Sequence, residues 1–285
     1  MTKGIAWITD TSALIDEAFI KKYNIYVLPI NIIFEDGPHR ETIDITNEEF
    51  YDKMRKSKVL PKTSQPVYGE MVALYRQLKE DGYTCGIAIH PSSVLSNTFS
   101  SSVNAAKDAG FPLYAIDSKI VSFPMMKMID TGNTLLNQGS SVEEIVEELN
   151  NMADRSELIG IPANLTQLFK SGRVPGISAF IGNLLNLKVI VSFQNGRVGL
   201  KEKVRTIKRA KQHVKDYLRE QSSRYNINEV AVIHCHNELD ASQWLEELQQ
   251  EFPAFKFLIL PISACIAVHT GEGTVGLSWV RENLK

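Results

Sequence analysis

Short apolar runs alternate with segments of helical period along the first half of the chain. Apolar runs of strand length occupy residues 5–9, 26–34, 86–90 and 113–117. Helical spacing marks residues 46–54, 67–78, 96–109, a stretch from about 121, and 141–155. Thr46 with Glu49 and Ser141 with Glu144 have the spacing of a capping box, which marks a helix start. Strands that alternate with helices predict a parallel α/β sheet with crossover helices.

The rhythm changes after about residue 155. Residues 187–193 and 198–203 flank Gly196 in a pattern typical of a β-hairpin, which a purely parallel winding lacks. Further helices are predicted over 206–221 and 241–251, and further strands over 230–235, 256–261 and 276–280. A chain of 285 residues lies near the size at which a single core stops growing. We therefore predict an N-terminal parallel-sheet α/β domain over residues 1–155 and a C-terminal mixed-sheet α/β domain over residues 156–285.

Composition and charge exclude several classes of protein. A hydrophobic share of 44% with 22% charged residues is ordinary for a globular protein, and a net charge of −2 attracts neither nucleic acid nor anionic membranes. No window approaches the roughly 18 apolar residues of a membrane span, and the N-terminus lacks the unbroken apolar core of a signal peptide. Cys85, Cys235 and Cys265 are too few and too scattered for a disulfide framework. We expect a cytoplasmic protein with no stable membrane insertion and no nucleic-acid partner.

Two hydroxyl-rich loops in the first half are candidate ligand sites. Thr63 and Ser64 lie just before a predicted helix, and Ser96 and Asn97 lie between a predicted strand and the next helix. Loops at the carboxyl ends of strands form the ligand crevice of α/β sheets, and helix starts favour a carboxylate or phosphate. The alternative is that Ser64 and Ser96 only cap their helices, which is the commonest use of serine there.

A third loop, residues 269–276, reads H-T-G-E-G-T-V-G and formally contains the dinucleotide fingerprint G-x-G-x-x-G. That fingerprint requires a following helix, whereas only nine residues remain after Gly276 and they alternate as a strand does. A tight glycine turn that places His269 and Thr270 over a crevice fits better, although a lone loop histidine is more often structural.

Basic residues form the remaining candidate sites. Arg173 follows a short helix, and Arg205 falls at a strand-to-helix junction where its side chain can point at a ligand. Residues 201–219 carry eight Lys or Arg against two acids, which is typical of either a solvated helix face or a docking surface for an acidic partner.

Other chemistries lack support in the sequence. His234 and His236 are expected on one face of a strand with Cys235 opposite, and two ligands do not make a zinc site. There is no nucleophile elbow and no phosphate loop, and no nucleophile–base–orienter set can be placed. We therefore predict no metal, no resident cofactor and no catalytic residue.

Six motifs in order along the chain resemble the DegV family, whose fatty-acid-binding members are called FakB. The resemblance begins with T-D-T-S at residues 9–12 and D-I-T at 44–46, and continues with T-S-Q-P at 63–66 and S-S-V-L-S-N-T at 92–98. It ends with G-R at 172–173 and H-T-G-E-G at 269–273. Departures from the family pattern are Asn97 and Ser171, each in place of a usual glycine, and bulky residues from Phe123 to Met128 that could line the acyl pocket or only fill the core.

The resemblance implies two α/β domains that bury a long-chain fatty acid of about C16–C18. It also implies that hydroxyls matching Thr63 and Ser96 bind the carboxylate, and that Arg173, Arg205 and His269 lie near the carboxylate or the phosphoryl-transfer site. A separate ATP-dependent kinase subunit, FakA, would make the acyl-phosphate that feeds phospholipid synthesis. This chain would then be the lipid-binding subunit and not catalytic alone.

Two rival functions remain open. One is an autonomous enzyme acting on a small carboxylate or phosphate, with His269 as general base. The other is a binding module for a different apolar ligand, such as a retinoid-like acid or a sterol.

Overall fold

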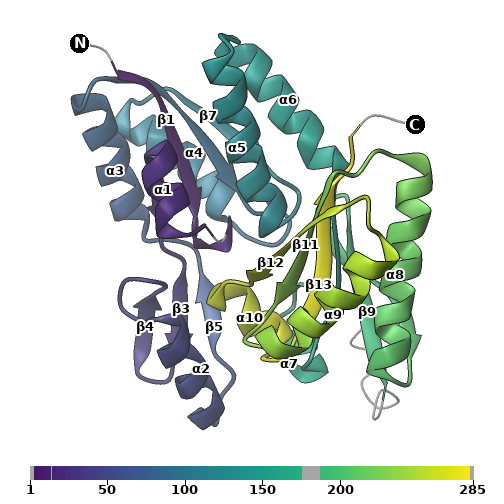
Figure 1. Cartoon of the computed structure of the whole chain (residues 1–285). Coiled ribbons are helices and arrows are strands. Elements are labelled where there is room, and N and C mark those ends of the chain that lie inside the picture. Colours follow the sequence, from purple (N-terminus) through teal and green to yellow (C-terminus); the bar gives the residue numbers. More distant parts are fainter. Residues whose placement is uncertain (1–2, 14, 175–186, 283–285) are drawn as a thin grey trace. The chain divides into compact units, whose positions relative to one another are not determined.

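The computed structural model describes residues 3–13, 15–174 and 187–282. Contacts between residues divide the chain into two compact units, Met1–Asp154 and Arg155–Lys285, one residue from the predicted boundary. The first unit contains a parallel sheet and the second a mixed sheet, which confirms the predicted fold class (Figure 1).

The main sheet of the first unit has four parallel strands in the order β2-β1-β6-β7. Its strands are β2 (Ile25–Leu28), β1 (Lys3–Asp10), β6 (Tyr83–His90) and β7 (Leu113–Asp117). The helices of this unit are η1 (Thr11–Ala13), α1 (Glu17–Tyr23), α2 (Asn47–Lys56), α3 (Tyr68–Glu80), α4 (Thr98–Ala109), α5 (Phe123–Asn137) and α6 (Val142–Arg155). Ala6 and Ile8 of β1 belong to the core cluster that contains residues of α3 and α4. Trp7, on the opposite face of β1, meets α5 at Gly132, where an added Cβ would lie 2.3 Å from the indole ring.

A small antiparallel sheet in the same unit corrects two predictions. It has the order β4-β3-β5, formed by β4 (Gly37–Arg40), β3 (Asn31–Phe34) and β5 (Lys62–Ser64). The predicted single strand over residues 26–34 is therefore wrong, because the chain leaves the parallel sheet at Pro29, which has no N–H to donate to a strand ladder. The segment around Thr63 and Ser64 is likewise the end of a strand and not a loop.

The second unit has one six-stranded mixed sheet in the order β10-β9-β8-β13-β11-β12. Its strands are β8 (Ser156–Ile161), β9 (Lys188–Gln194), β10 (Arg197–Val204), β11 (Glu229–His234), β12 (Lys256–Pro261) and β13 (Val275–Val280). β9 and β10 form the predicted antiparallel hairpin, β11 and β12 are parallel, and β13 runs antiparallel to both β8 and β11. The helices are α7 (Leu165–Lys170), α8 (Ile207–Arg224), α9 (Glu238–Glu251) and α10 (Ala264–Thr270). Because β13 follows the glycine turn, no βαβ unit surrounds the G-x-G-x-x-G segment.

Helices whose first turn is capped by a side chain begin where the sequence predicts. Thr46 and Glu49 form the predicted capping box of α2, and Ser141 and Glu144 form that of α6. The Thr206 hydroxyl accepts a hydrogen bond from the backbone N–H of Arg209 and caps α8. Each of these hydroxyls accepts a hydrogen bond from a backbone N–H group that would otherwise lack an acceptor at the helix start.

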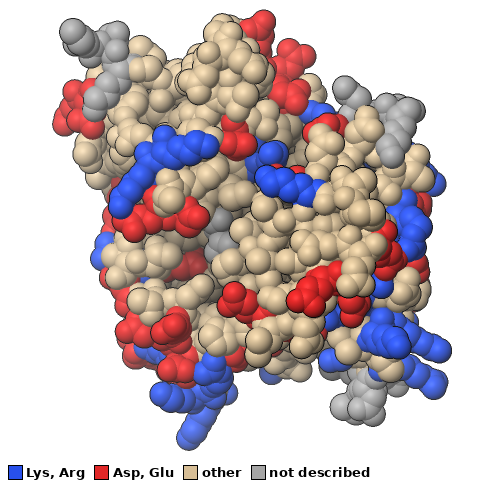
Figure 2. Space-filling model, in the orientation of Figure 1, with Lys and Arg blue, Asp and Glu red and all other residues tan. Residues whose placement is uncertain are grey.

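The basic segment over α8 is divided between ion pairs and solvent. Figure 2 shows Lys and Arg side chains over the part of the surface where α8 lies in Figure 1. Lys211 pairs with Asp240 at 2.6 Å, Lys215 pairs with Glu251 at 2.8 Å, and Arg219 also pairs with Glu251, so three cations bind the acidic side of α9. Lys208 is exposed instead. The basic face is therefore partly an ionic seam between two helices and only partly a solvated surface.

Candidate functional site

The carboxyl ends of three neighbouring parallel strands carry most of the candidate chemistry. Hydroxyl side chains follow each of these strand ends, namely Thr11 and Ser12 after β1, Ser92, Ser93, Ser96 and Thr98 after β6, and Ser118 and Ser122 after β7. Carboxyl ends of parallel strands meet at one edge of a sheet, where α/β proteins bind their ligands. The first unit thus has a hydroxyl-rich edge of the kind that binds an anionic head group.

Ser96 and Asn97 lie at the start of α4, and the N-cap position differs by one residue from the predicted one. Asn97 is the N-cap residue, is exposed, and makes no side-chain cap hydrogen bond. The Ser96 hydroxyl accepts from the N–H of Thr98 at 3.3 Å and lies 2.8 Å from the Thr98 hydroxyl. The predicted N-cap at Ser96 is wrong by one position, yet its partly buried hydroxyl still serves the first N–H of the helix.

Thr63 and Ser64 lie on β5 of the small sheet. In the register with β3, Thr63 is opposite Ile32 and Ser64 is opposite Asn31. The Asn31 amide donates to the carbonyl of Gln65 at 3.0 Å and holds the chain that leads to α3. The N-cap residue of α3 is Val67, without a side-chain cap, so the alternative that Ser64 caps this helix is wrong.

His269 and Thr270 end helix α10 and do not lie in the predicted loop. Gly271 follows with a φ of +89°, and an added Cβ would lie 2.6 Å from the Cβ of Asn164, so only glycine fits this turn. The Thr270 carbonyl accepts from the N–H of Asn164 at 3.1 Å, which joins the end of α10 to the start of α7. The predicted glycine turn is present, and it orients a helix end.

Within the second unit, the positive charge of Arg173 influences the pKa of His269. His269 is partly buried and its Nδ1 atom is buried. Burial, together with the positive charge of Arg173, lowers the pKa of His269 to about 4. The imidazole is therefore neutral at pH 7. A general base works best with a pKa near the working pH, so this shift disfavours the base role.

The other two candidates of the second unit, Thr270 and Arg205, have different surroundings. The Thr270 hydroxyl lies 3.4 Å from the carbonyl of Ile266, within α10, and 3.5 Å from the sulfur of Cys235, which directly follows β11. Arg205 lies at the predicted junction, between β10 and α8, and is exposed.

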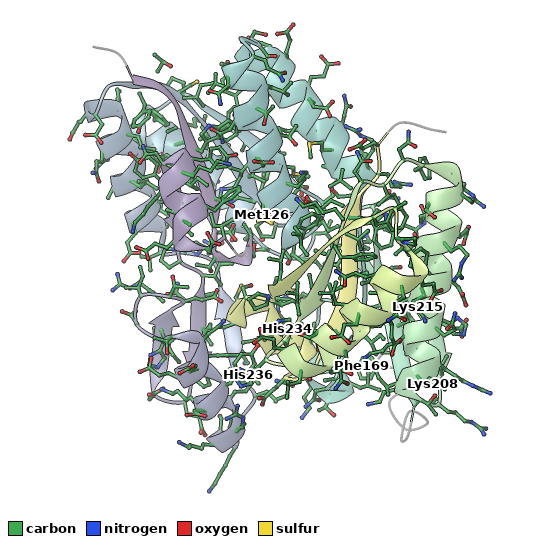
Figure 3. The ribbon with its side chains drawn as sticks, in the orientation of Figure 1. Met126, Phe169, Lys208, Lys215, His234 and His236 are labelled. Atoms are coloured by element: carbon green, nitrogen blue, oxygen red, sulfur yellow. The ribbon has the colours of Figure 1, made fainter. Side chains whose placement is uncertain are left out.

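The prediction that His234 and His236 lie on one face of a strand is wrong. The strand ends at His234, and His236 has a φ of +46°, so the alternation of faces breaks there. His234 is buried, which lowers its pKa, whereas His236 is exposed (Figure 3). In the part of the chain that the structure describes, no three His, Cys, Asp or Glu side chains come together to hold a metal ion.

Sequence reasoning missed a buried chain of polar side chains behind the hydroxyl-rich edge. Asp10 Oδ2 lies 2.8 Å from His90 Nδ1, and His90 Nε2 lies 2.8 Å from the Ser102 hydroxyl, which also bonds the Tyr75 hydroxyl. The statement that no nucleophile–base–orienter set can be placed is therefore wrong in its geometry. Ser102 is nonetheless fully buried in the second turn of α4. No substrate can reach it, so this arrangement is not a catalytic triad.

A second missed feature is the strained start of α5. Ser122 has φ +67° and ψ −135°, a region almost confined to glycine. Its hydroxyl is buried, with no hydrogen-bond partner among the described residues. No local sequence pattern marks such a residue, because the strain arises from the packing around it.

Comparison with known proteins identifies the family. The family model described as DegV, a family of uncharacterised proteins, matches residues 4–282. The chain belongs to the DegV family. Protein DegV of Bacillus subtilis is 34% identical over 97% of this chain and 99% of its own.

Two solved structures of the DegV family share the fold. The crystal structure of DegV, a fatty acid binding protein from Bacillus subtilis, has a TM-score of 0.88 and 33% identity over 98% of this chain and 99% of its own. A fatty acid binding DegV family protein from Streptococcus agalactiae has a TM-score of 0.90 and 30% identity over 99% of this chain and 100% of its own.

Proposed function

We propose that this chain binds a long-chain fatty acid and presents its carboxylate to a separate ATP-dependent kinase, which forms the acyl-phosphate. The observation that carries the proposal is fatty acid binding by two family members, each at least 30% identical over nearly the whole chain. The hydroxyl-rich sheet edge of the first unit supports it, because it supplies groups suited to a carboxylate.

The proposed carboxylate ligands are Thr63 and Ser96, with Ser64, Asn97, His269 and Thr270 as further candidates. An ionised carboxylate costs several kcal/mol to bury unless donors surround it, and hydroxyls and helix N–H groups are such donors. His269 is neutral at pH 7, and a neutral imidazole can still donate one ring N–H to a carboxylate. The acyl tail of about C16–C18 adds about 0.8 kcal/mol of stabilisation for each buried methylene.

The proposed kinase is a separate FakA-like protein, and this chain is its lipid-binding subunit. The sequence has no phosphate loop that would hold ATP. Arg173 and Arg205 are the proposed cations for the phosphoryl-transfer step or the partner, and the exposure of Arg205 suits that role. The proposed place of action is the cytoplasm, in keeping with Cys85, Cys235 and Cys265, which form no disulfide. None of the helices in the described ranges combines the length and apolar character that a membrane span requires.

Mass spectrometry of the purified protein, first native and then denaturing, tests the ligand class. We expect a copurified species with the mass of a C16–C18 fatty acid that is lost on extraction. An uncharged lipid would contradict the carboxylate site. A protein that is empty and also refuses added fatty acid would contradict the proposal as a whole.

Variants of the two hydroxyls test the site itself. Thr63→Ala and Ser96→Ala are each expected to weaken palmitate binding about 10-fold or more, because a charge-assisted hydrogen bond contributes roughly 1.5–3 kcal/mol. Ser100→Ala is the matched control, since this exposed hydroxyl of α4 donates to the carbonyl of Asn97. Wild-type affinity in both Thr63→Ala and Ser96→Ala would remove the assigned site.

The kinase step has its own test. Incubation of palmitate-loaded protein with ATP and a candidate kinase subunit is expected to give acyl-phosphate, trapped as the hydroxamate, only when both proteins are present. Turnover by this chain alone, lost in His269→Ala, would instead establish the autonomous enzyme.

A further inference from the structure

The side chains from Asp10 to Tyr75 form a buried polar network beside the apolar core of the first unit. Its four members, Asp10, His90, Ser102 and Tyr75, each have 0% of their surface exposed. Burial of polar and charged groups is unfavourable unless every hydrogen bond is made, and complete networks hold a core in one arrangement. Burying this network therefore costs free energy that apolar side chains would not. Its effect is to fix the relative positions of the elements that it joins.

The available donors and acceptors determine which group donates in each hydrogen bond of the network. Burial raises the pKa of Tyr75 to about 12, so the phenol keeps its proton. Among the described residues, the Tyr75 hydroxyl is bonded to the Ser102 hydroxyl. The buried phenol proton is used only if Tyr75 is the donor of this bond, and we assign it so. The Ser102 hydroxyl then donates to His90 Nε2, and the N–H at Nδ1 donates to Asp10 Oδ2. Every polar hydrogen of the chain is used when His90 carries its proton on Nδ1.

Asp10 also holds the segment that follows β1. Its Oδ1 accepts from the N–H of Ser12 at 3.0 Å and from the Ser12 hydroxyl. The carbonyl of Ser12 accepts from the N–H of Ser122 at 2.9 Å, at the start of α5. One carboxylate thus joins the carboxyl ends of β1 and β6 to the starts of two helices.

Helix α4 depends on this network in its first half. Its buried face consists of Thr98 and Ser102 near the start and Ala105, Ala106 and Ala109 near the end. The alanines contact the apolar core, where dispersion and burial are non-directional and tolerate small shifts. The start of the helix is held instead by the 2.8 Å hydrogen bond between Ser102 and His90, which fixes distance and direction.

Ser96 is carried by that same half of α4. Its hydroxyl accepts from the N–H of Thr98, one turn before Ser102. The other end of its loop is fixed separately, because the N–H of Ser92 donates to the carbonyl of Ile120 at 3.0 Å and the N–H of Ser93 donates to Asp117 at 3.1 Å. The N–H of Ser96 also donates to the carbonyl of Ser92 at 3.0 Å, so Ser96 is bonded both to the base of its loop and to the start of α4. A movement of α4 would therefore shift the Ser96 hydroxyl relative to that base.

We propose that His90 and Asp10 are positioning residues for the carboxylate site. Acting through Ser102, they hold the start of α4 and the Ser96 hydroxyl at the carboxyl ends of β1 and β6. This position determines how strongly the protein prefers a carboxylate to an uncharged head group on the same acyl chain. The assignment rests on the proposed function.

The test compares palmitate with hexadecanol, which has the same chain and no charge. Dissociation constants are measured by displacement of a fluorescent fatty acid from delipidated full-length protein. Ser102→Ala cuts the connection from His90 to α4, and we expect palmitate to bind about 10-fold more weakly while hexadecanol changes less than about twofold. A general loss of stability would weaken both ligands alike.

Two controls separate positioning from stability. Tyr75→Phe removes one hydroxyl and leaves the bond between His90 and Ser102 intact, and we expect it to keep the wild-type preference. Ala105→Gly weakens α4 through helix propensity without touching the network, and we expect it to lower the melting temperature without changing the preference. An equal change of preference in Ala105→Gly would overturn the assignment.

Asp10→Asn is the second variant, for use if Ser102→Ala does not fold. It keeps the side-chain volume but directs an NH₂ group at His90 Nδ1, which favours the other tautomer and reverses the hydrogen bonds. We expect nitrogen NMR to detect that tautomer and the preference for palmitate to fall several-fold.

The outcomes distinguish the two proposals. A wild-type protein that fails to bind palmitate, or binds hexadecanol equally well, overturns the proposed function and this assignment together. A wild type that prefers palmitate, with the preference unchanged in Ser102→Ala, or in Asp10→Asn with a switched tautomer, overturns this assignment alone.

Discussion

At the scale of single residues, the burial of His269 makes the free energy of unfolding depend on pH. The pKa of His269 is about 4 in the folded protein, against an ordinary value near 6.5 in the unfolded chain. Between these values the unfolded state binds the extra proton, so the free energy of unfolding falls as the pH drops from about 6.5 to 4. The contribution is fully present above about pH 6.5.

We expect His269→Gln to make the free energy of unfolding less dependent on pH in that window. The difference in the loss between pH 7 and pH 4 should be on the order of 2 kcal/mol. Urea titrations at pH 7, 5.5 and 4 measure it. His234, whose pKa is also lowered, keeps part of the slope in both proteins and serves as the internal reference. Parallel curves for the wild type and the variant would contradict the shift.

Ser122 is the residue at which the backbone is strained. Its positive φ costs about 1–3 kcal/mol for a side chain with a Cβ, whereas glycine adopts it freely and loses about 0.5–1 kcal/mol through its larger unfolded-state entropy. We expect Ser122→Gly to be about 1 kcal/mol more stable than Ser122→Ala, in which the strain remains. Thermal unfolding of the pair measures the difference. The reverse order of stability would mean that the backbone changes when the hydroxyl is removed.

At the scale of elements, the seam between α8 and α9 shows how a basic segment divides its roles. Lys215 has 13% of its side chain exposed and pairs with Glu251, whereas Lys208, two turns away on the same helix, is exposed (Figure 3). Surface pairs contribute about 0–1 kcal/mol, whereas removal of one partner of a less exposed pair costs more, because the other charge is left uncompensated.

We expect Lys215→Met to lower the free energy of unfolding by about 1 kcal/mol and Lys208→Met to change it by less than about 0.5 kcal/mol. Methionine keeps an apolar stem in both variants, so the comparison isolates the charge. Urea denaturation at low salt measures both. Equal effects would show that the seam adds nothing beyond an ordinary surface charge.

Local side-chain chemistry explains which elements could be predicted. Capping boxes at Thr46 and Ser141 identify their helices because the cap and its acceptor lie three residues apart. The division of residues 26–34 into β2 and β3 was missed, because an apolar run has the same pattern whichever sheet it joins. Helix α10 was missed because it has only seven residues, most of them apolar, and no side-chain cap marks its start.

At the scale of the whole molecule, each unit has a core of its own. One core cluster contains Ile8, Tyr75 and Ala105 of the first unit, and another contains Ile159, Val232 and Trp279 of the second. Both units fall within the size range of independent domains.

We expect a fragment of residues 1–155 to fold without the rest of the chain. It should give a cooperative thermal transition by circular dichroism and a well-dispersed amide NMR spectrum, because its two sheets are complete within it. A broad, non-cooperative transition would show that the second unit is needed for its stability.

The sequence by itself determined the fold class, the hairpin of β9 and β10, the capped helices and the family, since all of these depend on local spacing or on motifs in order. Only the tertiary structure decided that Arg173 acts on His269, and that Asp10, His90 and Ser102 form one buried network. Asp10 and His90 are 80 positions apart, and the hydrogen bond between them exists because two parallel strands end side by side. A contact of that kind depends on the distance between folded elements, and the order of residues along the chain leaves that distance open.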